Sequence, residues 1–158
     1  DAFPRVYKVF ETYGLNKRVT WIGSGKLGLP SRAVQAFAMG IDLVNVAREA
    51  LLSIGCIQAM NCHNDKCPTG ITTHNKWKQR GLVPELKSQR FANYHAELLK
   101  VIKVVANGMG REHPYDVTMD QIEIRKGGVN VPQDIMYEYG NIRRATYQEL
   151  NEYNQSLN

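Results

Sequence analysis

Apolar residues recur at helical spacing in three stretches of the chain. They do so over residues 3–13, over residues 30–38 and, over the longest distance, across residues 84–108. Such spacing places apolar side chains on one face of a helix, so each stretch predicts an amphipathic helix that packs on a core. His95 lies on the third apolar stripe, and we expect it to be a packed histidine rather than a metal ligand.

Two short runs of β-branched and aromatic residues separate these helices. Residues 18–22 (Arg-Val-Thr-Trp-Ile) and residues 41–46 (Ile-Asp-Leu-Val-Asn-Val) predict strands, and residues 47–52 predict a further helix. Helices and strands that alternate at such short intervals are typical of parallel βα units, which places the chain in the α/β class. Residues 129–158 show weak periodicity, and we expect part of that tail to be flexible.

Composition narrows the possible classes of protein. The 158 residues are 43% hydrophobic, enough for one sizeable core, and no apolar run approaches the roughly 18 residues of a membrane helix. The N-terminus lacks the features of a signal peptide, and clustered free cysteines suit a reducing compartment, so a cytoplasmic protein is expected. The net charge is +5, but Lys and Arg are dispersed, which argues against a nucleic-acid-binding surface.

A glycine-rich turn, Gly23-Ser24-Gly25-Lys26-Leu27-Gly28, follows the first predicted strand. Its glycines free backbone N–H groups to approach an anion, and the next helix presents its positive end to the same place. The turn is not a nucleotide P-loop, because Lys26 is followed by Leu27, nor a dinucleotide fingerprint, because no acidic residue ends the next strand. The pattern is compatible with a phosphate site and also with a tight turn that needs glycine for its geometry.

The loop after the second predicted strand presents Asn45 and Arg48. In a (β/α)8 barrel, the loops after the last two strands often hold a phosphate group, and two consecutive βα loops fit that arrangement. A whole barrel takes about 250 residues, so if the fold is a barrel, the chain is only its final portion. For Arg48, a surface ion pair with a nearby acid is the alternative to phosphate binding.

All three cysteines of the chain lie in one turn-rich stretch, as Cys56, Cys62 and Cys67. An odd number cannot pair off completely as disulfides, and three converging thiolates favour a metal centre. An iron–sulfur cluster with one cysteine ligand fewer than the usual four fits this count. A zinc site completed by His63 or His74 is the second possibility, and three ordinary buried cysteines are the third.

The chain resembles the FMN-binding glutamate synthase family over residues 55–73, Gly-Cys-Ile-Gln-Ala-Met-Asn-Cys-His-Asn-Asp-Lys-Cys-Pro-Thr-Gly-Ile-Thr-Thr. In that family, three cysteines at this spacing bind a [3Fe–4S] cluster. Residues 22–28 and 40–48 resemble the family's last two barrel strands with their FMN-phosphate loops. The resemblance implies the C-terminal portion of an FMN-binding (β/α)8 barrel, divided into the last two βα units (1–55), an iron–sulfur loop (56–75) and a helical extension (84–158).

The same resemblance implies which residues form the site. Cys56, Cys62 and Cys67 would be the cluster ligands. No catalytic residue is expected, because in the family the residues that grip the flavin ring and 2-oxoglutarate lie upstream of these strands. The FMN phosphate would be held by Gly23, Ser24, Gly25, Lys26, Ala47 and Arg48.

The activity that the resemblance implies belongs to a full-length protein, in which electrons pass through the cluster and FMN to convert 2-oxoglutarate and ammonia into glutamate. The present chain alone should be inactive. The implied partners are the remainder of the barrel, an electron donor (ferredoxin or a pyridine-nucleotide reductase subunit) and an ammonia-supplying amidotransferase, and unpaired strand edges predict self-association. Two alternatives from other classes are a small zinc-binding (Cys3His) interaction module and a metal-free oligomerisation domain built on the helix at 84–108.

Overall fold

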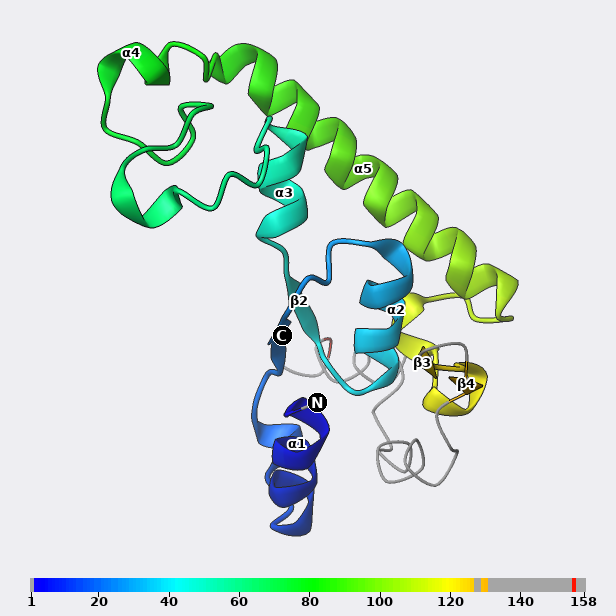
Figure 1. The fold of residues 1–158 in the computed structure, drawn as a ribbon. Coiled ribbons are helices and arrows are strands. Elements are labelled where there is room, and N and C mark those ends of the chain that lie inside the picture. Colours follow the sequence, from blue (N-terminus) through cyan, green and yellow to red (C-terminus); the bar gives the residue numbers. More distant parts are fainter. Residues whose placement is uncertain (1, 127–128, 131–154, 156–158) are drawn as a thin grey trace.

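The computed structural model describes residues 2–126, 129–130 and 155 of the chain. Those residues form a small α/β unit in which helices pack around a pair of parallel strands (Figure 1). The α/β class expected from the alternating helices and strands is therefore confirmed. The helices and strands are α1 (Phe3–Thr12), β1 (Ile22–Ser24), α2 (Pro30–Ala38), β2 (Leu43–Asn45), α3 (Arg48–Ser53), α4 (Lys76–Gln79), α5 (Pro84–Gly108), β3 (Arg125–Lys126) and β4 (Val129–Asn130).

The parallel sheet consists of β1 and β2, paired from Ile22 opposite Leu43 to Ser24 opposite Asn45. Both strands are shorter than predicted, and the prediction of a strand over 18–22 is wrong for most of its length. A 3₁₀ turn occupies Asn16–Arg18, and the strand begins only at Ile22. Before Ile22, Val19 is exposed, whereas the Trp21 side chain packs against α1.

That packing centres on Trp21, which joins α1 to the start of β1. Its ring lies 5.5 Å from Phe3, 5.1 Å from Tyr7 and 5.1 Å from Phe10, measured between ring centroids. Its indole N–H donates a hydrogen bond to the carbonyl oxygen of Asn16 at 3.1 Å. Aromatic residues of α1 thus pack around the half-buried Trp21 side chain, which fixes this helix beside the sheet.

The core lies where α2, α5 and the segment after α5 meet. The two helices contribute small and branched side chains to it, which lets their backbones approach closely. The helix predicted over residues 84–108 is observed with those bounds. The buried members of this core are Ala33, Val34, Ala38, Leu98, Ile102, Ala106, Val117 and Met119.

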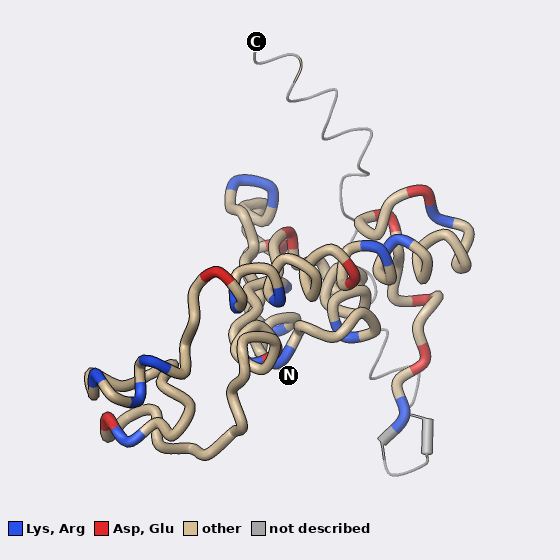
Figure 2. Tube along the Cα trace, turned by 90° about the horizontal axis from the view of Figure 1, so that it is seen from above, with Lys and Arg blue, Asp and Glu red and all other residues tan. Residues whose placement is uncertain are grey.

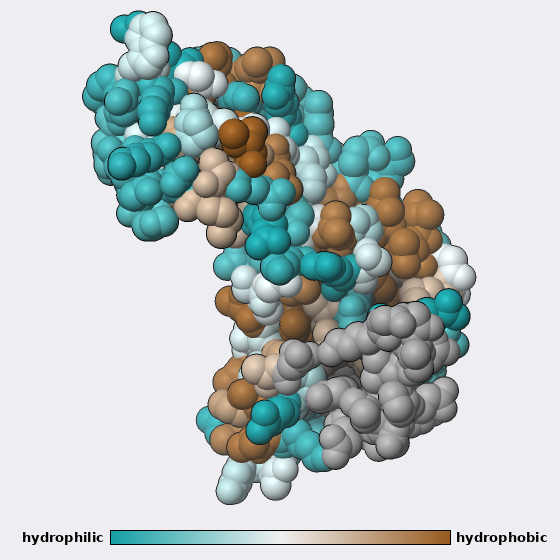
Figure 3. Space-filling view, in the orientation of Figure 1, coloured by the Kyte–Doolittle hydropathy of each residue, from teal (hydrophilic) through white to brown (hydrophobic). Residues whose placement is uncertain are grey.

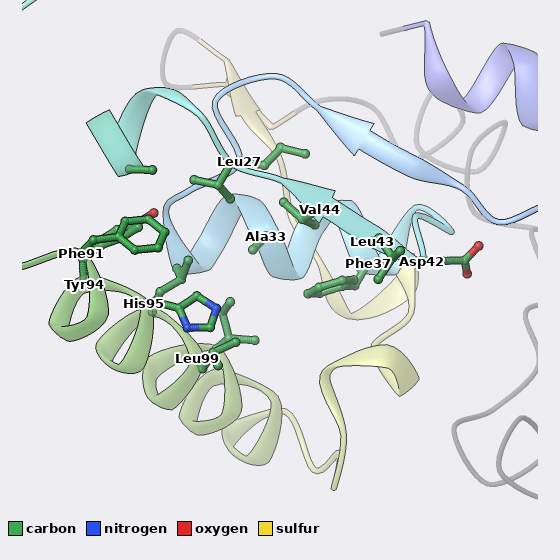
Figure 4. A pocket seen from close by; sticks show the side chains of 14 residues that line it. Leu27, Ala33, Phe37, Asp42, Leu43, Val44, Phe91, Tyr94, His95 and Leu99 are labelled. Atoms are coloured by element: carbon green, nitrogen blue, oxygen red, sulfur yellow. The ribbon is translucent and has the colours of Figure 1, made fainter. Parts of the chain in front are cut away.

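The prediction that His95 is a packed residue is wrong, because its side chain is exposed. It lies at the rim of an apolar groove of about 220 Å³ between α2, β2 and α5 (Figure 4). There its ring stacks on Phe91 with an interplanar angle of 18° and a centroid distance of 6.4 Å. One helical turn later, the same apolar face of α5 reaches the core, where Leu98 and Ile102 pack against α2.

In the described chain, the C-terminal extension begins with α5. After it come 3₁₀ turns at Pro114–Asp116 and Met119–Gln121 and an antiparallel pair of two-residue strands, β3 and β4. The expected flexibility of the tail concerns residues that lie almost entirely outside the described part. No helix in that part combines the length and the apolarity needed to cross a bilayer.

Replacing Leu98 by Ala tests the packing of α5 on α2. Leu98 is 8% exposed, whereas its neighbour Leu99 is 53% exposed, so Leu99→Ala is a matched control on the same helix. We expect Leu98→Ala to lower the free energy of unfolding by about 2–4 kcal/mol, because it leaves a cavity, and Leu99→Ala to change it by less than about 1 kcal/mol. Urea denaturation followed by circular dichroism measures both. Equal losses would show that α5 packs through a different face.

Candidate functional site

The two loops predicted to hold an anion lie at the same edge of the sheet. Because β1 and β2 run parallel with Ser24 opposite Asn45, the chain leaves both strands side by side. The glycine-rich turn follows the first strand, and Ala47 with the start of α3 follows the second. Five of the six predicted phosphate-binding residues are exposed there: Ser24, Gly25, Lys26, Ala47 and Arg48.

Gly23, the sixth, has a structural role. A Cβ atom at this position would lie 2.3 Å from Cδ1 of Ile41, so only glycine fits against that side chain. Gly25 differs, because its φ is +140° and nothing lies within 4 Å of where its Cβ would be. Lys26 follows with a φ of +62°, a left-handed conformation that a non-glycine residue adopts at some energetic cost. The backbone between them is therefore strained and open to solvent.

Three basic residues surround this edge: Lys26, Arg32 and Arg48. The Arg32 guanidinium donates to the carbonyl oxygen of Lys26 at 3.4 Å, across the mouth of the turn. Arg48 forms no ion pair with any acidic side chain that the structure describes. The surface ion pair considered for Arg48 is therefore absent from the described chain, and its guanidinium keeps its donors for a ligand. Lys and Arg are otherwise spread over helices and loops (Figure 2).

Sequence reasoning missed two residues that contact the end of the turn. The Tyr94 hydroxyl, on α5, donates to the carbonyl oxygen of Gly28 at 2.7 Å, and Glu49 on α3 packs beside the same glycine. Burial, and then the negative charge of Glu49, raise the pKa of Tyr94. No local motif predicts these contacts, because Tyr94 and Gly28 are 66 positions apart.

The cysteine loop has an irregular backbone between α3 and α4. Gln58, Met60 and Asp65 have φ values of 56°, 56° and 62°, all in the left-handed region. These bends fold the loop on itself, so that Cys56, Cys62 and Cys67 line one small hollow. Strained non-glycine residues of this kind are concentrated at ligand-binding loops.

Asp65 ties the middle of the loop to its C-terminal end. Its carboxylate accepts the backbone N–H of His74, and its carbonyl oxygen accepts the Thr73 hydroxyl at 2.7 Å. The His74 hydrogen bond, supported by the Thr73 hydroxyl and by nearby positive charge, keeps the pKa of Asp65 below its usual value. A Cβ at Gly70 would lie 2.2 Å from the carbonyl oxygen of Lys78, so this glycine lets α4 pack directly on the loop.

The three cysteines have different surroundings. Cys67 is buried, Cys56 is half-buried and accepts the N–H of Gln58 at 3.4 Å, and Cys62 is exposed. The pKa of the Cys67 thiol is lowered to about 6, chiefly by the Thr69 hydroxyl 3.4 Å away and then by the Thr72 backbone N–H. Cys67 is therefore mostly thiolate at neutral pH, the form that binds metals.

The sulfurs do not converge on the position of a single ion. Within the described residues, no group of three or more His, Cys, Asp or Glu side chains is arranged to hold one metal ion. The zinc site considered with His63 or His74 is therefore not preformed. A cluster places different demands on the loop, because each thiolate binds its own iron and the ligands need only surround a common space. The hollow meets this demand of a cluster, because all three cysteine thiols line it.

Comparisons with known proteins identify the family. The family model described as the conserved region in glutamate synthase matches residues 1–112. The glutamate synthase large subunit-like protein YerD of Bacillus subtilis is 34% identical over 125 residues, 79% of this chain and 24% of YerD. The archaeal glutamate synthase [NADPH] of Archaeoglobus fulgidus is 29% identical over 97 residues, covering 61% of this chain and 19% of that protein.

The ferredoxin-dependent glutamate synthase of Cyanidium caldarium is 30% identical over 116 residues, which cover 73% of this chain and 7% of that protein. The chain thus spans about a quarter or less of the length of these relatives. No solved structure matches it. Since the family model covers well over half of its residues, including both strand-end loops and all three cysteines, the chain belongs to the glutamate synthase family.

Proposed function

We propose that this chain is the part of a glutamate synthase-type oxidoreductase that holds a [3Fe–4S] cluster and the phosphate group of FMN. The observation that carries the proposal is the single hollow lined by Cys56, Cys62 and Cys67, because a multi-iron group requires several thiolates around one space. Membership of the glutamate synthase family supports the same redox function. The chemistry supplied by the bound groups is electron relay and hydride delivery, which in the full-length protein converts 2-oxoglutarate and ammonia to glutamate.

The cysteine loop would hold the cluster through residues that are already prepared as ligands. Cys67 carries a thiolate at neutral pH, so metal binding there releases few protons. The Thr69 hydroxyl and the backbone N–H of Thr72 surround its sulfur, and hydrogen bonds to ligand sulfurs are one means by which proteins tune a cluster's reduction potential. Asp65 would keep the loop closed around the hollow.

The strand-end loops would hold the phosphate group of FMN. Exposed backbone at Ser24, Gly25 and Lys26 lies beside Ala47 and Arg48, and a phosphate favours backbone N–H donors together with a planar guanidinium. Gly23 contributes indirectly, since its close contact with Ile41 fixes the start of the turn. The open space beside Gly25 would let the anionic end of a cofactor approach this backbone.

The remainder of an FMN-binding (β/α)8 barrel would be the partner of this fold. One face of the small sheet is open, with Ile22 65% and Leu43 55% exposed, and apolar side chains are visible around α1 and along α5 (Figure 3). Relatives about three times as long as this chain have the additional residues to cover such a face. An electron donor, either ferredoxin or a pyridine-nucleotide reductase subunit, and an ammonia-supplying amidotransferase complete the proposed assembly.

The substitution Cys62→Ser separates the iron–sulfur proposal from a zinc module. After anaerobic reconstitution, we expect the wild-type chain to bind iron with broad visible absorption and Cys62→Ser to lose most of that iron, because one thiolate ligand is gone. His63→Ala, the adjacent exposed position, is the control and should keep its iron. Elemental analysis and absorption spectra measure both. Stoichiometric zinc that disappears in His63→Ala would instead establish a Cys3His zinc site.

The lowered pKa of Cys67 predicts a pH profile for the metal-free chain. Because the Thr69 hydroxyl stabilises the thiolate, Thr69→Val should raise the pKa of Cys67 from about 6 toward the roughly 8.5 of a free thiol. Peptide-resolved alkylation rates across pH 5–9 give the midpoint directly. Thr12→Val, which removes a hydroxyl bonded to Lys8 within α1, is the control and should leave the midpoint unchanged. If the midpoint is unchanged in Thr69→Val, the Thr69 hydroxyl does not stabilise the Cys67 thiolate and has no part in preparing it to bind a cluster.

A further inference from the structure

One side chain of α5 reaches back to the glycine-rich turn. Tyr94 donates its hydroxyl hydrogen to the carbonyl oxygen of Gly28 at 2.7 Å, and the rest of its side chain is half-buried. The ring lies beside Phe91, with 6.4 Å between centroids, and both rings line the groove together with Leu27 of the turn itself (Figure 4). Packing of the ring therefore sets the direction in which the hydroxyl points.

Gly28 is enclosed on the side where a Cβ atom would lie. That atom would be 2.5 Å from the Tyr94 hydroxyl oxygen, 2.6 Å from Cβ of Glu49 and 2.6 Å from Cγ1 of Val46. Residues from the end of β2, from α3 and from α5 thus meet on one backbone position. The far end of the turn is held at this junction, whereas its middle, at Gly25, has open space around it.

The same helix also contacts the entrance to the cysteine loop. The Lys87 ammonium nitrogen lies 2.9 Å from where a Cβ of Gly55 would be, immediately before Cys56. Lys87 and Tyr94 are seven residues apart, about two helical turns, so they extend from the same face of α5 and lie about 10 Å apart along its axis. A single rigid helix therefore contacts both the turn and the loop.

We infer that Tyr94 is a positioning residue for the anion site, holding the turn at 23–28 in the shape that binds the cofactor's phosphate group. This inference rests on the proposed function, because it takes the turn to be the phosphate site. Tyr94 acts through the carbonyl oxygen of Gly28 and touches neither the phosphate nor the reacting atoms. Its hydroxyl remains a donor throughout the neutral range, since both burial and Glu49 oppose its ionisation.

The conservative variant Tyr94→Phe tests this role, because it keeps the ring in the groove and removes only the donor to Gly28. We expect amides of residues 24–28 to exchange hydrogen faster and to show larger amplitudes in ¹⁵N relaxation, since one anchor of the turn is lost. We also expect FMN affinity to fall about three- to tenfold, the range of one neutral hydrogen bond, because the phosphate group is the part of FMN that this chain would bind. Tyr13→Phe, 74% exposed at the end of α1, is the control and should change neither quantity.

Each outcome bears on a separate claim. Turn amides in Tyr94→Phe that match the wild type would overturn the positioning role, and so would faster exchange throughout α2 and α5 as well as in the turn, which indicates a general structural effect. A wild-type chain that binds riboflavin as tightly as FMN, or binds neither, would overturn the proposed phosphate site. The exchange and relaxation measurements need no ligand, so in that case they still decide whether Tyr94 holds the turn.

Discussion

The packing of α5 against α2 is the contact on which the rest of the described structure depends. Ala33 and Ala38 of α2 face Leu98, Ile102 and Ala106 of α5, and these side chains form most of the core. Small residues on both helices permit close approach, and burial of the larger ones provides the stabilising free energy. Without this contact, α5 would have no fixed position relative to the strands, and the junction at Gly28 would not form.

This packing also fixes where the cysteine loop lies. The loop leaves α3 and continues through α4 to the start of α5, and α3 and α5 contact each other. The segment that contains the loop therefore begins and ends at two helices that pack together. The proposed phosphate site and the cysteine hollow thus belong to one architecture, and α5 contacts the approach to each of them.

Glycine has a separate physical purpose at each of three positions in this region. At Gly23 a side chain of Ile41 occupies the place of a Cβ, and at Gly28 three elements crowd the backbone. At Gly25 the surroundings are open, and it is the positive φ that requires glycine. The turn is accordingly fixed at both ends and accessible in the middle, a shape suited to close approach of an anion to backbone N–H groups.

The sequence by itself determined the α/β class, the bounds of α5 and the family, because periodic hydrophobicity and the spacing of Cys56, Cys62 and Cys67 are properties of neighbouring residues. It misplaced the first strand, since the apolar character of Trp21 reflects contacts with α1 that lie outside the local pattern. It also misassigned His95, whose position on the stripe was right but whose side chain faces the groove rim rather than the core. Only the tertiary structure brought Tyr94 to Gly28 and the Thr69 hydroxyl to the Cys67 sulfur. Such contacts depend on how distant or irregular backbone segments are oriented in space, and local composition and spacing do not encode that orientation.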